Sequence, residues 1–179
     1  MSRLAEAPEL RPALEHAPGA LAALESAHEA ACLAVDPVLA GCLRRRVAES
    51  LGLGASGDSP PSVAEREACF EFADQFVTYV PGVTDAQRRA VAVELGDDRR
   101  LELARMLYVF DMADRLVLAL GRLYEPRGEG ADGLPPVEPK PLGAAVDDLH
   151  ATAMQLHELD PVTTELVRLH CARYHDCKT

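Results

Sequence analysis

The sequence predicts an all-α protein, and three observations support this fold class. Helix-capping signals recur along the chain, aliphatic residues follow helical spacing, and no segment shows the strict apolar–polar alternation of a strand. Hydrophobic residues make up 48% of the chain, but aromatic residues only 4%, and tryptophan is absent. The expected core is therefore aliphatic, built on Leu, Val and Ala.

The expected helices follow from their start and stop signals. Asp36 and Pro37 open a helix because Asp can cap the first N–H groups and Pro suits the first helical position. Capping boxes open two more helices at 62–65 and 84–87, and Asp97-Asp98 caps the longest one. The expected helices span 20–35, 36–52, 62–80, 84–95, 99–123, 144–159 and 161–177.

Composition divides the chain into four segments. Residues 1–19 hold three prolines and little apolar periodicity, which predicts a loose N-terminal arm. Residues 20–125 form a first helical unit. The stretch 126–141 is rich in Pro and Gly and is expected to be a semi-extended linker. Residues 142–179 then begin a second helical unit.

The helix expected over 99–123 is apolar around most of its circumference. Such a helix belongs in a core or in an oligomer interface, so we expect the chain to form a homo-oligomer. Asp111 and Arg115 interrupt the apolar pattern at i, i+4 spacing, and we interpret them as an intrahelical ion pair rather than a buried functional carboxylate.

The net charge of −11 excludes some partners. Nucleic-acid binding depends on cationic neutralisation of phosphates, and anionic membrane surfaces are disfavoured for the same reason. No apolar run reaches membrane-spanning length, and the N-terminus lacks the apolar stretch of a signal peptide. The expected location is cytoplasmic.

Five scattered cysteines do not form a disulfide framework. Cys32, Cys42 and Cys69 are expected to be small buried apolar residues. Cys171 with His175, and His170 with Cys177, lie on two different helix faces and make two half-sites rather than one zinc site. We therefore expect no metal and no other cofactor.

A segment of the chain occurs twice. The stretch 160–172 aligns with 36–48, with identical residues at Asp36/Asp160, Pro37/Pro161, Val38/Val162, Arg44/Arg168 and Ala48/Ala172. Duplication of a structural unit explains the match. The alternative is that Asp-Pro-Val is simply a good helix start.

The second copy carries Glu165 and, after eleven residues, Cys177. This spacing resembles the carboxymuconolactone decarboxylase and alkylhydroperoxidase D superfamily, whose motif is Glu, eleven residues, Cys-x-x-Cys, three residues, His. The resemblance implies a helical bundle of the alkylhydroperoxidase D-like type, with 20–125 as a degenerate unit and 142–179 as the truncated start of a second. It also implies that Glu165 is a proton-relay carboxylate and Cys177 the resolving thiol of a peroxidase that a thiol reductant protein recharges.

The resemblance is incomplete. The peroxidatic cysteine and the relay histidine have no counterpart in the sequence, so we expect this chain to be inactive as a peroxidase. In the first copy, Gly41 and Leu53 stand at the positions of Glu165 and Cys177, which favours a non-catalytic helical scaffold or oligomerisation module. A lactone decarboxylase or isomerase, which needs no cysteine pair, is a further alternative. Glu165 could equally be an ordinary first-turn carboxylate.

Overall fold

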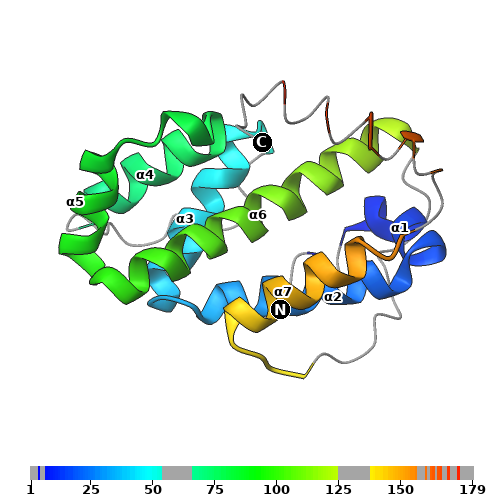
Figure 1. The fold of residues 1–179 in the computed structure, drawn as a ribbon, viewed down its shortest axis with the longest axis horizontal. Helices are drawn as coiled ribbons and strands as arrows, with labels where there is room; N and C mark the ends of the chain where they lie inside the picture. Colours follow the sequence, from blue (N-terminus) through cyan, green and yellow to red (C-terminus); the bar gives the residue numbers. More distant parts are fainter. Residues whose placement is uncertain are drawn as a thin grey trace.

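The computed structural model describes Leu4, residues 7–53, 66–124 and 138–156, and seven further positions between 160 and 173. All regular structure in those residues is helical, which confirms the all-α class (Figure 1). The elements are η1 (Pro8–Leu10), α1 (Arg11–His16), α2 (Pro18–Leu33), α3 (Pro37–Ser50), α4 (Glu67–Thr78), η2 (Val80–Gly82), α5 (Asp85–Leu95), α6 (Asp97–Leu123) and α7 (Leu142–Ala153). None of these helices is long and apolar enough to cross a membrane.

Helix α6 is the centre of the structure. It contacts α3, α4 and α5 on one side and α2 and α7 on the other (Figure 1). Its buried apolar residues are Leu103, Met106, Leu107, Val109, Phe110 and Ala113. The apolar circumference that predicted an oligomer interface is thus largely covered by helices of the same chain.

The N-terminal segment differs from the loose arm expected over 1–19. Its described part forms η1 and α1, and Leu4 and Leu10 are fully buried in the core. Pro8 and Pro18 do not prevent this, because each lies in the first turn of a helix, where the missing N–H is not required. Element η1 contacts α6, so this segment covers part of the central helix.

Helix α7 packs against α2 and α6. Its buried residues Leu142, Ala145, Val146 and Leu149 join the same core as the preceding helices, and Tyr108 Oη and His150 Nε2 form a hydrogen bond of 2.9 Å. Residues 125–137, most of the expected linker, lie outside the described residues. The assignment of 142–179 to a second unit stays a prediction, although α7 itself shares the core of the first.

Two of the predicted helix starts have the expected cap. The Asp36 carboxylate accepts hydrogen bonds from the N–H groups of Val38 and Leu39, at 3.0 and 3.2 Å. Asp160 accepts from Val162 and Thr163 at the equivalent positions, at 3.0 and 3.1 Å. The two copies of Asp-Pro-Val therefore have the same cap geometry, which both duplication and capping convergence would produce.

Two other helix starts need comment. The capping box of Thr84 and Gln87 is confirmed, whereas the one expected at 62–65 lies outside the described residues, and α4 is described from Glu67. The cap of α6 was predicted wrongly. Gly96, with a φ of +89°, occupies the N-cap position, and Asp97 and Asp98 lie in the first turn of the helix. Gly96 suits this tight corner because the left-handed region carries little steric penalty without a Cβ.

We expect Asp36→Ala to lower the free energy of unfolding by about 1 kcal/mol, because it leaves two N–H groups at the start of α3 without their acceptor. Urea denaturation measures the change. Glu49→Ala, at an exposed position of the same helix, is the control and should stay within about 0.5 kcal/mol. Equal effects of the two substitutions would show that the Asp36 cap does not stabilise the fold.

Candidate functional site

Glu165 lies in the helical segment that follows Asp160, and its side chain is exposed. Hydrogen bonds from the side chain and backbone of Thr163 hold the pKa of Asp160 below its usual value, so the capping carboxylate remains charged. Cys177 lies outside the described residues, as do Cys171, His170 and His175. The pairing of Glu165 with Cys177 therefore stays a prediction.

The three described cysteines are free thiols with little tendency to ionise. Cys42 and Cys69 are buried, as predicted, whereas Cys32 is only partly buried against the core. Burial is the main cause that raises the pKa of all three thiols. Because the thiolate is the nucleophile and the thiol is inert, these residues are poorly suited to attack a peroxide.

Cys69 belongs to a small polar group between α4 and α5. Its Sγ donates a hydrogen bond of 3.4 Å to Glu94 Oε2, while Glu94 Oε1 accepts the Ala68 N–H at 3.0 Å. In return, the Arg66 guanidinium donates to the backbone carbonyl of Glu94 at 2.7 Å. Each helix thus caps an end of the other, because backbone groups at helix ends lack intrahelical partners.

These contacts keep the Cys69 thiol protonated. Burial and the hydrogen bond to Glu94 raise its pKa to about 12. A carboxylate can activate a nearby cysteine only by accepting its proton, and here it stabilises the protonated thiol instead. No pattern along the chain indicates this role of Glu94, because it depends on the folding of α5 back along α4.

A second polar group lies between α2 and α6. Glu25 and His28 of α2 and Asp114 of α6 are all at most 6% exposed. Ser26, also buried, lies about 200° around α2 from His28 and is not part of this group. The His28 ring packs against Phe110 with 5.3 Å between ring centroids. Glu25 is one turn before His28, and Asp114 is one turn after Phe110.

Because α2 and α6 run in opposite directions, Glu25 and Asp114 lie on the same side of the His28–Phe110 contact. A Cβ built on Gly121, near the end of α6, would lie 3.2 Å from Cγ of Glu9, so the start of the chain lies beside the end of α6. Helix α2 therefore runs antiparallel to α6 (Figure 1). The Glu25-x-x-His28 spacing, on the apolar face of an Ala/Leu-rich helix, was the sequence signal for this group, and the sequence analysis missed it.

The polar α2–α6 group does not qualify as a metal site. Among the residues that the structure describes, no group of three or more His, Cys, Asp or Glu side chains could hold a metal ion. Asp111 was the carboxylate weighed from the sequence, and its ion pair with Arg115 is confirmed at 2.8 Å. Arg115 also donates to the carbonyl of Val77 at 3.0 Å, so it ties α6 to α4. The buried carboxylate of α6 is Asp114.

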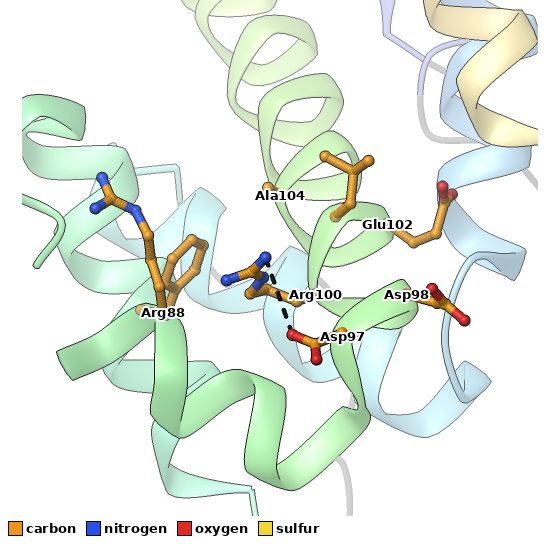
Figure 2. Close-up of a pocket in the computed structure, with 8 residues that line it drawn as sticks. Arg88, Asp97, Asp98, Arg100, Glu102 and Ala104 are labelled. Carbon is orange, nitrogen blue, oxygen red and sulfur yellow. Dashed lines mark ion pairs between the residues drawn. The ribbon is translucent and has the colours of Figure 1, made fainter. Parts of the chain in front are cut away.

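A depression of about 710 Å³ opens on the surface where α5 turns into α6. We call it the α5–α6 groove. Its charged side chains are Arg88, Asp97, Asp98, Arg100 and Glu102, and Phe72, Leu101 and Ala104 supply apolar surface. Arg88 and Arg100 lie on one side of the groove, and Asp98 and Glu102 on the other (Figure 2). From the sequence, Asp97 and Asp98 were expected only to cap a helix.

Comparison with known proteins gives relatives but no activity. The chain is similar to the uncharacterized proteins MT2376 and Rv2313c of Mycobacterium tuberculosis, from strains CDC 1551 / Oshkosh and ATCC 25618 / H37Rv. Each is 33% identical over 152 residues, which cover 80% of this chain and 53% of the relative. The chain therefore spans about half the length of the curated relatives it matches. No protein-family model matches it. No solved structure is significantly similar to it.

Proposed function

We propose that residues 20–125 are a non-catalytic helical scaffold, and that peroxide chemistry of the alkylhydroperoxidase D-like type belongs to the segment that carries Glu165 and Cys177. The observation that carries this proposal is the burial of the described cysteine thiols, complete or nearly so for Cys42 and Cys69 and partial for Cys32, which raises the pKa of each. A peroxide-reducing thiol needs the opposite shift, toward the thiolate. The first unit thus holds three thiols, none of them prepared for nucleophilic attack.

Two features support a separate role for the segment after Asp160. Asp160 accepts hydrogen bonds from the N–H groups of Val162 and Thr163 at the helix start, and Glu165 is exposed, so that its carboxylate could exchange protons with solvent and substrate. In the proposed chemistry, two thiols are oxidised to a disulfide while a hydroperoxide is reduced to an alcohol and water. Glu165 would relay protons, Cys177 would be the resolving thiol, and a cytoplasmic thiol protein would reduce the disulfide. The sequence holds no counterpart of the peroxidatic thiol, so this chain should not turn over hydroperoxide.

The scaffold function is supported independently by the core. Helices α2 to α7 share one hydrophobic cluster, and the polar residues Glu25, His28 and Asp114 are also shielded from solvent. A unit of this kind can position a partner segment without contributing a reacting group. If Glu165 is only a first-turn carboxylate, the scaffold remains as the function of the chain.

The test compares the oxidation of individual thiols by a small alkyl hydroperoxide. We expect Cys177 to be oxidised before Cys32, Cys42 and Cys69, once per chain and without turnover because its partner thiol is missing. Glu165→Gln should slow this oxidation by on the order of a hundredfold, because the variant removes the base. Mass spectrometry of peptides labelled with a sulfenic-acid reagent measures the rate at each cysteine. Glu67→Gln, an exposed first-turn carboxylate of α4, is the matched control and should have no effect.

Two outcomes would contradict the proposal. Oxidation of Cys69 ahead of Cys177 would show that the first unit is catalytic after all. An unchanged rate in Glu165→Gln would remove the thiol chemistry from the second segment and leave the scaffold function alone.

A further inference from the structure

The charges of the α5–α6 groove are unevenly distributed: Arg88 and Arg100 lie on one side together with Asp97, and Asp98 and Glu102 lie on the other (Figure 2). Leu101 lies in the first turns of α6, is 53% exposed and is surrounded by the charged residues of the groove. Successive residues of an α-helix are rotated by about 100° around its axis. By this rotation Arg100 lies on one side of Leu101, while Asp98 and Glu102 lie on the other. Arg88 of α5 adds a second positive charge to the side of Arg100.

Two charges of the groove are engaged within the chain, because Arg88 pairs with Asp85 at 2.7 Å and Glu102 pairs with Arg105 at 2.8 Å. Arg100 and Asp98 are held less closely. Arg100 is 4.0 Å from Asp97, and the two side chains are 41% and 85% exposed, so this ion pair contributes little. Asp98 makes no ion pair with any residue that the structure describes. Arg100 and Asp98 are thus available for pairing with another molecule.

We propose that a second copy of this chain docks on the α5–α6 groove through a two-fold axis that passes beside Leu101. In a contact with two-fold symmetry, every pair of residues that touches across the interface occurs twice, once in each direction. Leu101 would pack against the partner's Leu101, and Arg100 would face the partner's Asp98 and the partner's Glu102. The same two charge contacts then form twice.

The charge of the whole chain favours this place over others. Each copy carries a net charge of −11, so two copies repel each other over most of their surfaces. Contact between two copies is favoured where positive and negative side chains of one copy can face negative and positive side chains of the other, beside apolar surface. The groove meets both conditions, because its basic and acidic sides flank an exposed leucine.

The proposal is tested with two variants of opposite charge, studied alone and mixed. Arg100→Glu makes both sides of the groove acidic, and the double variant Asp98→Arg with Glu102→Arg makes both sides basic. Each variant alone should weaken dimerisation at least about tenfold, because like charges meet in both contacts. Mixed in equal amounts, the two should form a heterodimer, because every contact again joins opposite charges. Sedimentation velocity and native mass spectrometry distinguish these species.

Arg99→Glu is the matched control. It makes the same change of net charge one residue away, on the far side of α6 from Leu101, and should leave the dimer unchanged. Circular dichroism confirms that each variant is folded. A monomeric unmodified chain at high micromolar concentration would overturn the proposal. So would dimers of both charge variants when each is alone, or a mixture of the two that stays monomeric.

Discussion

Cys69 should react with iodoacetamide at least about a thousandfold more slowly in the folded protein than in the unfolded chain. The rise of its pKa from 9.0 to about 12 lowers the thiolate fraction near neutral pH by about that factor, since each pKa unit is tenfold. The side chain is also 0% exposed, which keeps the reagent away. Peptide mapping by mass spectrometry after timed labelling, with and without denaturant, measures the ratio.

Glu94→Gln is the informative variant for this thiol. It removes the negative charge that disfavours the Cys69 thiolate but keeps an oxygen that can accept the Ala68 N–H. We expect faster labelling of folded Cys69 in this variant and no change at Cys42, which does not contact Glu94. Rapid labelling of Cys69 in the unmodified folded chain would contradict the assignment of the first unit as a scaffold with inert thiols.

Phe110→Ala should lower the free energy of unfolding by about 3–5 kcal/mol, the usual cost of emptying a buried aromatic position. Phe110 is 1% exposed and fills the α2–α6 interface, where it packs against the His28 ring. The substitution therefore leaves a cavity in the central contact of the fold and removes an apolar wall from the buried polar group. Urea denaturation, followed by helical circular dichroism, measures the loss.

Leu123→Ala is the control on the same helix. Leu123 is 74% exposed, so its truncation should change the free energy of unfolding by no more than about 0.5 kcal/mol. Similar losses in the two variants would mean that α6 is not packed as the structure shows. A small loss in Phe110→Ala alone would mean that the α2–α6 interface collapses around the cavity.

The helices could be predicted closely from sequence because their signals are local. The capped starts at Asp36, Thr84 and Asp160 and the apolar spacing of α6 depend on residues within one or two turns of each other. The N-terminal arm was predicted wrongly for the same reason. Its prolines suggested an irregular segment, and only contact with α6 shows that Leu4 and Leu10 are core residues.

The candidate site could be predicted only in part. Glu165 was found from its spacing to Cys177, a pattern along the chain, but such a pattern does not show which side chains meet. The pairing of Cys69 with Glu94 requires α5 to fold back along α4, and the burial of Asp114 rather than Asp111 depends on which face of α6 meets α2. The α5–α6 groove likewise combines residues of two helices, α5 and α6, which meet at the Gly96 corner.

The sequence by itself determined the fold class, the main helix starts, the ion pair of Asp111 with Arg115 and the negative charge of the chain. These properties follow from composition and from neighbours along a helix. The tertiary structure alone decided which polar residues are buried, which thiols are protonated and which charges face outward beside Leu101. The physical reason is that burial, and the pKa shifts and surface patches that follow from it, depend on contacts between helices far apart in the sequence.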